Sequence, residues 1–157
     1  MAALLFSAHG AAATEETANT ARNGRFCSVL VGAAAPRGVS PTLAQSCSDL
    51  SRQAADAGLR LKARALGLRH QEVPIMFWYT DPEFHGEWTT VYGQHGHCDA
   101  AGYTVRPNTY WATKLSSVKG AAYCDRIRVN DGPVFDLPAP RMPGVDFANK
   151  IHVWASR

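Results

Sequence analysis

The stretch that most constrains how this chain can fold covers residues 74–93. Residues 75–79 are dense in β-branched and aromatic side chains, and residues 87–92 alternate polar with apolar side chains, which is the pattern of two β-strands. Asp81-Pro82 and His85-Gly86, which lie between them, are residue pairs that favour turns. We therefore expect a β-hairpin with a folded corner. The spacing of its aromatic residues either marks a specific type of corner, or these residues merely cover a small core.

The composition is that of one domain with at most an appendage, because 46% of the 157 residues are hydrophobic and 18% are charged. The formal net charge of +3 is modest, and the basic residues are not grouped together with interleaved aromatic residues. Dedicated nucleic-acid binders show such grouping, so nucleic acid is not expected as a partner.

The cysteines predict disulfides. Cys27, Cys47, Cys98 and Cys124 lie far apart and form no Cys-x-x-Cys pair, so a zinc knuckle is disfavoured. An even number of well-separated cysteines in a small chain suits two disulfides in an oxidising compartment. We favour Cys27–Cys47 and Cys98–Cys124, since each pair closes a short loop within one half of the chain. The alternative is four reduced, buried cysteines in a cytosolic protein.

The amino-terminal segments are not expected to belong to the core. Residues 1–13 form a short apolar run that ends in small residues, as the cleavage region of a secretion signal does, although no basic segment precedes the run. They are interpreted as the remnant of such a signal, or as an Ala-rich arm that the mature protein keeps, and they are too short to span a membrane. Residues 14–25 are polar and have no hydrophobic period, so we expect a flexible arm that a partner orders. The arm residues expected to bind are Thr14, Glu15, Glu16, Thr17, Ala18, Asn19 and Thr20.

Residues 26–72 are expected to add one strand and one helix to the main domain. The strand covers residues 26–31, and a loop that contains prolines follows it. The helix is expected to open at Cys47, with Ser48 or Asp49 as its cap. Apolar residues recur at helical spacing along a stripe that should pack on the sandwich: Leu50, Ala54, Ala57, Leu61, Ala65 and Leu68. The basic residues beside this stripe form either a solvated face or a binding surface.

A loop at residues 94–99 invites a metal-site interpretation, because it holds His95, His97, Cys98 and Asp99. However, a disulfide is expected to use Cys98, and the two histidines need a further ligand that the sequence does not supply. No metal or other cofactor is therefore expected.

Together with the hairpin, the remainder of the chain forms two similar units of four short strands, of which the first ends at Gly120 and the second starts at Ala121. With turns between them, strands are expected near residues 102–105, 110–118, 121–129, 133–137 and 145–154. Residues 112–118 and 148–154 both carry Lys followed by Leu or Ile in the same register. The two matching endings indicate an internal duplication.

Several of these features together resemble the βγ-crystallin-like double Greek-key family, particularly its secreted actinomycete members. The resemblance rests on the spacing Tyr79, Phe84, Gly86, on Lys114-Leu115-Ser116-Ser117-Val118, and on a degenerate second copy at residues 146–151, and it covers residues 73–156. It implies that the aromatic pair forms a corner on a folded hairpin and that the glycine permits the chain to fold over. The expected fold is a mostly β, two-Greek-key sandwich over residues 73–157, with the amino-terminal strand and helix packed on it.

The resemblance also implies two calcium loops, but the residues of both depart from the pattern. Calcium needs six to eight oxygen ligands, which in that family come from an acidic or amide pair followed by hydroxyl residues. The first loop has Ala112 and Thr113 in place of the pair, although Ser116 and Ser117 remain. The second loop keeps Asn149 but has His152 and Val153 in place of the hydroxyls. Calcium binding is therefore expected to be weak or absent, and the serines are expected to support turns.

The expected function is that of a secreted, non-catalytic protein-binding module. No motif brings a nucleophile, a base and an orienting group together, so the chain is not expected to be an enzyme. The resemblance and the arm favour an adapter or structural subunit of a secreted antibacterial toxin assembly of the umbrella type. The alternatives are a proteinase inhibitor or a killer-toxin-like antimicrobial protein of the same fold. Aromatic residues are expected as partner anchors wherever they reach the surface: Trp78, Trp88, Tyr92, Tyr103, Tyr110 and Trp111.

Overall fold

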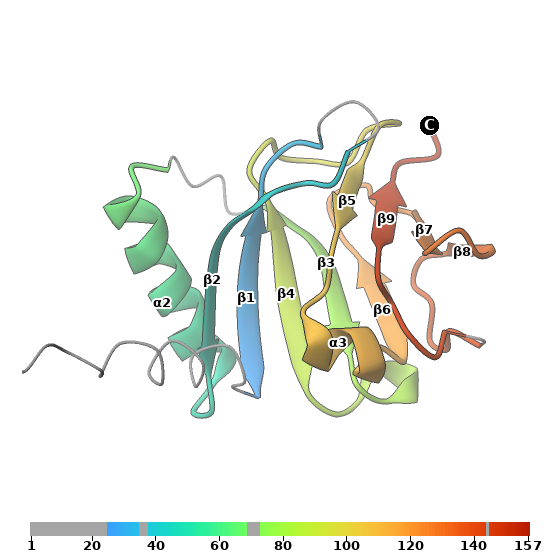
Figure 1. The fold of residues 1–157 in the computed structure, drawn as a ribbon, viewed down its shortest axis with the longest axis horizontal. Helices are drawn as coiled ribbons and strands as arrows, with labels where there is room; N and C mark the ends of the chain where they lie inside the picture. Colours follow the sequence, from blue (N-terminus) through green and yellow to red (C-terminus); the bar gives the residue numbers. More distant parts are fainter. Residues whose placement is uncertain (1–24, 35–37, 69–72, 144) are drawn as a thin grey trace, which may run out of the picture.

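The fold consists of two β-sheets that enclose a core, with one helix on the outside of the first sheet (Figure 1). A computed structural model describes residues 25–34, 38–68, 73–143 and 145–157. The arm residues Thr14 to Thr20 and the signal-like segment 1–13 lie outside these described residues. The class is mostly β, as predicted.

The first sheet has the strand order β2-β1-β4-β3-β6. Its centre is the predicted hairpin, in which β3 (Val73–Tyr79) pairs antiparallel with β4 (Trp88–Gly93). The short helix η1 (Pro82–Phe84) lies in the connection between these two strands. Strand β6 (Ser117–Gly120) lies antiparallel to β3 on the other side. The hairpin prediction is therefore confirmed.

An amino-terminal hairpin extends this sheet and corrects the prediction for the segment after residue 31. Strand β1 (Phe26–Val31) is at the predicted place, but the chain then returns as a second strand, β2 (Thr42–Ser48), and β1 pairs parallel with β4. The helix α2 (Arg52–Ala65) starts only after β2. Its cap is Ser51, whose Oγ accepts a hydrogen bond from the Ala54 N–H, and not Ser48 or Asp49.

The second sheet has the strand order β5-β9-β7-β8 and is antiparallel throughout. Its strands are short: β5 (Tyr103–Val105), β7 (Arg126–Val129), β8 (Val134–Asp136) and β9 (Ile151–Trp154). Strand β5 lies between β4 and β6 in the sequence but pairs in the second sheet. Conversely, Ala139 lies between β8 and β9 in the sequence but forms a bridge with Val118 of the first sheet. The first predicted unit therefore contributes β5 to the second sheet, and the second predicted unit contributes Ala139 to the edge of the first sheet.

The segment before β6 differs from its prediction, because residues 109–114 form the helix α3 (Thr109–Lys114) and not the beginning of a strand. Asn108 caps this helix, since its Oδ1 accepts a hydrogen bond from the Trp111 N–H. Trp111 is buried, and its ring packs at 6.1 Å from that of Trp78. Core packing of Trp111 thus outweighs the strand preference of the Thr, Tyr and Trp in this segment.

The apolar interior has two parts. The larger part lies between the sheets and includes fully buried side chains such as Trp78, Ile127 and Ile151. The smaller part lies between the first sheet and α2, where Leu30 and Tyr92 meet Leu59, Ala44 and Ala63.

A polar contact anchors α2 at the edge of the smaller core. The hydroxyl groups of Tyr92 and Ser28 both donate hydrogen bonds to the Oδ1 of Asp56, the first at 2.9 Å. Burial and the hydrogen bond to Asp56 raise the pKa of Tyr92 to about 12. The tyrosine therefore stays protonated and keeps donating to the helix.

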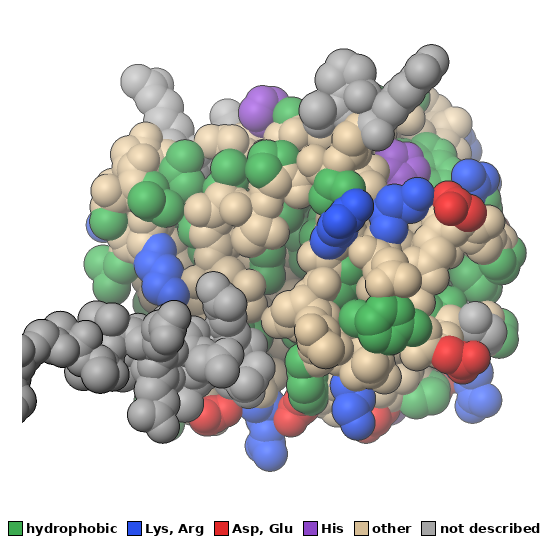
Figure 2. All heavy atoms as spheres, viewed as in Figure 1, with side chains coloured by type: hydrophobic (Ala, Val, Ile, Leu, Met, Phe, Trp, Pro, Cys, Tyr) green, Lys and Arg blue, Asp and Glu red, His purple; other side chains and the backbone are tan. Residues whose placement is uncertain are grey.

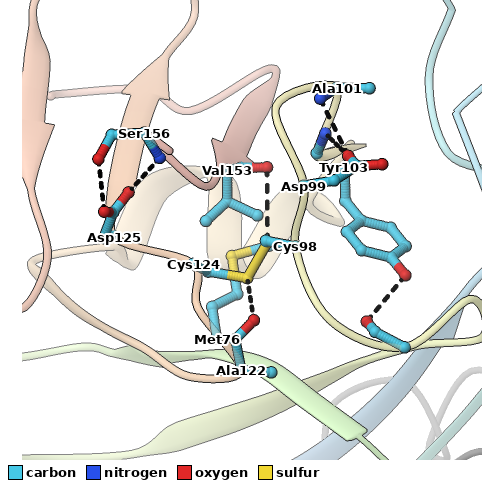
Figure 3. Close-up of a disulfide and its surroundings, with 12 residues drawn as sticks. Met76, Cys98, Asp99, Ala101, Tyr103, Ala122, Cys124, Asp125, Val153 and Ser156 are labelled. Carbon is cyan, nitrogen blue, oxygen red and sulfur yellow. Dashed lines mark hydrogen bonds between the residues drawn. A yellow bond between two sulfur atoms is a disulfide. The ribbon is translucent and has the colours of Figure 1, made fainter.

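Both predicted disulfides are present. Cys27–Cys47 joins directly opposed residues of β1 and β2, and Cys98–Cys124 joins the loop after β4 to the loop before β7. Figure 3 shows the second disulfide between the carbonyl groups of Val153 and Ala122. Beside it, the Asp125 carboxylate accepts hydrogen bonds from the backbone N–H and the hydroxyl of Ser156, at 2.7 and 2.6 Å (Figure 3). Two disulfides fit an oxidising, extracellular environment.

None of the helices in the described parts of the chain combines the length and the apolar character that a membrane span requires.

Candidate functional site

The residues predicted to form the hairpin corner lie together and build the fold. The rings of Tyr79 and Phe84 pack edge to face at 5.7 Å. Gly86 has a φ of 82°, and a Cβ atom there would lie 2.3 Å from the Oγ1 of Thr80, so this position requires glycine. The corner contacts the second unit through Glu83, whose N–H donates to the carbonyl of Pro140.

The hydroxyl groups of the first calcium-like loop support this corner. Ser116 Oγ donates to the Thr80 carbonyl at 2.6 Å, and Ser117 Oγ donates to the Asp81 carbonyl at 2.7 Å. Ser117 Oγ also accepts a hydrogen bond from the Phe84 N–H. Both serines therefore hold the hairpin corner, which is the structural role that the sequence predicted.

The two calcium-like loops meet at a seam between α3 and the second sheet. The Ala148 N–H donates to the Ala112 carbonyl at 2.7 Å, and the Asn149 N–H donates to the Oδ1 of Asn130. An open pocket of about 590 Å³ lies at the seam, and its lining includes the cations Arg106 and Lys150. Positive charges at this position oppose the binding of a calcium ion.

The residues of the loop that the sequence offered for metal binding are used for other contacts. No group of three or more His, Cys, Asp or Glu side chains in the described ranges is arranged to hold a metal ion. Cys98 is in a disulfide, and the His97 ring instead packs against Tyr123 at 5.1 Å.

Most of the aromatic residues that were proposed as anchors belong to the core. Trp78, Tyr92, Tyr103 and Trp111 are buried. Trp88 is half-buried, stacked on Tyr79, with the Arg52 guanidinium 4.9 Å above its ring. Tyr110, also half-buried, donates a hydrogen bond to the Glu87 carboxylate. These contacts leave little exposed surface on the six aromatic side chains that were proposed as anchors. The large apolar side chains that are exposed are a different set: Leu50, Leu61, Leu66, Tyr123, Val134 and Phe147.

Four residues of the apolar stripe predicted for this helix face away from the sheets. Leu50 is 87% exposed and Leu61 is 67% exposed, and Ala57 and Ala65 beside them are exposed as well. We call these four residues the helix face. The expectation that this stripe packs on the sandwich is therefore wrong for these four residues, whereas Leu68, the last residue of the stripe, packs against the smaller core. The side chains of α2 that are buried are Ala55, Leu59 and Ala63.

Close packing of the helix on β2 explains this orientation. Gly58 lies directly over Ser46, and a Cβ atom at this glycine would lie 2.2 Å from the Ser46 Oγ. Small residues at 55, 58 and 63 allow the helix to approach the sheet, and only Leu59 inserts a large side chain. The sequence signal was this combination of small residues with one leucine, which a count of apolar residues overlooks. Arg60, Lys62 and Arg64 are exposed on the same helix and place positive charge beside the helix face.

The helix face has the properties of an unoccupied interaction surface. Large exposed apolar side chains that gather on one helix mark protein–protein contacts, because their burial by a partner removes apolar surface from water. The amphipathic helix that lies in a groove of another protein is a recurring form of this recognition.

The outer face of the second sheet carries the other notable set of side chains. His152 stacks on Trp154 with ring centroids 4.9 Å apart, and its Nδ1 is 2.8 Å from the Thr104 Oγ1. Burial, followed by the positive charge of Arg128 and then of Lys150, lowers the pKa of His152 below its usual 6.5.

This lowered pKa predicts a loss of stability in mild acid. As the pH falls below about 6.5, the unfolded chain takes up the His152 proton before the folded chain does, so the free energy of unfolding decreases until the pH is below the folded-state pKa. Replacing His152 with glutamine should remove this part of the pH dependence. Urea unfolding of both proteins at about pH 7.5 and pH 5.5, with an NMR titration of the imidazole, measures it. A His152 ring that titrates above 6.5 would contradict the prediction.

The sequence matches no described protein family, and comparisons with curated proteins and with solved structures find no match either.

Proposed function

We propose that this chain is a non-catalytic protein-binding module and that a partner protein covers the helix face. The observation that carries the proposal is the exposure of Leu61 on α2 and of Leu50 just before its cap, while Leu59 on the opposite side of the helix is buried. Arg60, Lys62 and Arg64 flank the face, so the partner's groove is apolar with an acidic rim.

We further propose that the protein is secreted and that its fold is of the βγ-crystallin-like double Greek-key type. The two disulfides support secretion. The exchange of β5 and the Ala139 segment between the two sheets supports a pair of interlocked Greek keys, as does the aromatic corner of Tyr79 and Phe84. On this resemblance, the favoured role is an adapter or structural subunit of a secreted antibacterial toxin assembly, and the second is a proteinase inhibitor or killer-toxin-like protein.

Partner binding tests the proposal. Purification of the protein under native conditions from culture supernatant should yield a stoichiometric companion, a large subunit for the adapter role or a protease for the inhibitor role. Replacing Leu61 with aspartate should weaken binding of that companion about 30-fold, since a central apolar anchor contributes about 2 kcal/mol or more. Isothermal titration calorimetry measures the change.

Replacing Val134 with aspartate is the matched control, because Val134 is also exposed but lies on β8 in the second sheet. The affinity of the Val134→Asp variant for the companion protein should equal that of the parent protein. Deletion of residues 14–25 separates the arm from the helix face: a loss of binding on deletion supports the arm as an additional contact. A protein that elutes alone, or Leu61→Asp with full affinity, would overturn the proposed binding face.

A further inference from the structure

The outer face of the second sheet is a positively charged surface that is separate from the helix face. Side chains alternate along a strand, and Ile127, Val129, Ile151 and Val153 point into the core. The residues between and beside them therefore point outward. They include four residues that we call the cationic band, Arg106, Arg126, Arg128 and Lys150, together with His152, which lies beside Arg128. Figure 2 shows Lys and Arg side chains gathered over β5 and β9 in this region.

Strand register places the members of the band side by side. Arg128 lies opposite His152, which in turn lies opposite Thr104 of β5. Val105 pairs with Ile151, so Arg106 and Lys150 follow one residue beyond this pair, at the pocket between the two loops. Neighbouring strands are about 4.8 Å apart, so Arg106, Arg128 and Lys150 lie close together on one surface of the sheet.

Two of the cations in the band have acidic partners and two do not. Lys150 Nζ lies 3.0 Å from the Asp131 carboxylate, and Arg126 pairs with Asp136. Both aspartate side chains are largely exposed, so these pairs are weak in water. The exposed Arg106 and Arg128 have neither an ion pair nor a hydrogen bond to a residue in the described ranges. The band therefore keeps a net positive charge that can attract an anion.

The pocket at one end of the band adds groups that suit a sugar. Besides Arg106 and Lys150, its lining includes the polar side chains of Thr109 and Asn149 and the ring of Phe147, which is 44% exposed. Amide and hydroxyl groups bind sugar hydroxyls, an aromatic ring packs on the apolar face of a pyranose, and two cations bind a carboxylate. A volume of about 590 Å³ is within the range of small-ligand pockets.

We propose that the cationic band binds an acidic polysaccharide, with one uronate residue in this pocket and its carboxylate between Arg106 and Lys150. The following acidic residues of the polymer run along the sheet toward Arg128. The site does not depend on the protein-binding function proposed above, because it uses the other sheet. Asp131 is the one acidic side chain among the described residues that line the pocket, and it competes with the ligand for Lys150.

Binding of polygalacturonate by the full chain at low ionic strength tests this proposal, with affinity electrophoresis as the measurement and neutral dextran as the reference polymer. Arg106→Gln and Lys150→Gln should each weaken retention about tenfold, because each removes a charge-assisted contact. Asp131→Asn should strengthen it. Binding should also weaken as the salt concentration rises.

Arg64→Gln on α2 is the matched control, since it makes the same charge change at an exposed position outside the band, and it should leave retention unchanged. All four positions are at the surface, and circular dichroism verifies that the variants are folded. Retention that Arg64→Gln reduces as much as Arg106→Gln would overturn the site. Duplex DNA or anionic lipid vesicles that bind as tightly as polygalacturonate, with the same response to Arg106→Gln, would overturn the assignment to a polysaccharide.

Discussion

Replacing Leu59 with alanine is expected to lower the free energy of unfolding by about 2 to 5 kcal/mol, because the leucine is fully buried between α2 and the first sheet and its removal leaves a cavity. The same replacement at Leu61, two residues away, should change the stability by less than about 0.5 kcal/mol, since this side chain is 67% exposed. Both variants replace a leucine with an alanine inside the same helix, so intrinsic helix propensity does not account for the difference.

Urea unfolding followed by circular dichroism measures both variants under the same conditions. Equal destabilisation by the two replacements would contradict the orientation of α2, and so would a larger effect at Leu61. The pair also separates folding from binding. Leu61→Ala should leave the fold intact, so a loss of partner affinity in this variant reports on the helix face alone.

Removing the disulfide between Cys98 and Cys124 should produce the second large effect. With both cysteines replaced by alanine, the free energy of unfolding is expected to fall by about 3.5 kcal/mol, because the unfolded chain regains the entropy of a loop of 26 residues. Cys98 and Cys124 are also buried in the main core, between the sheets, which adds a packing cost.

Thermal and urea unfolding of the double variant, compared with the parent protein, measures this loss. The companion variant that replaces Cys27 and Cys47 is the control, because its loop of 20 residues predicts a similar entropic loss at the other end of the molecule. Unchanged stability of the Cys98/Cys124 variant would contradict the prediction. So would peptide mapping, under non-reducing conditions, that joins Cys27 to Cys98.

The two proposed surfaces lie on different sheets of the molecule. Helix α2 packs on the first sheet at one end of the molecule, and the strands that carry the cationic band belong to the second sheet at the other end (Figure 1). A protein partner on one surface therefore leaves the other surface accessible to a polysaccharide. On these two proposals, the module would link a protein to a charged matrix without a change in its own conformation.

The parts of the fold that were predicted correctly depend on local chemistry. The β3–β4 hairpin follows from strand-forming residues on either side of two turn pairs, and the disulfides follow from cysteine spacing. Strand β2 was missed because Thr42–Ser48 contains small polar residues, which have little strand preference of their own. It is a strand because β1 supplies its hydrogen bonds and Cys27 faces Cys47.

The candidate surfaces also combine features that follow from local sequence with features that depend on tertiary contacts. The sequence by itself indicated an apolar stripe in the helix, two calcium-like loops with an incomplete set of oxygen ligands and, through the resemblance, a role for Gly86 at the corner. Only the tertiary structure decided that Leu61 faces water while Leu59 is buried, because this depends on how closely Gly58 lets the helix approach Ser46. It also brought Arg106, Arg128 and Lys150 onto one face from three separate segments. Helical periodicity identifies the faces of a helix, but the element that packs against it determines which face is buried.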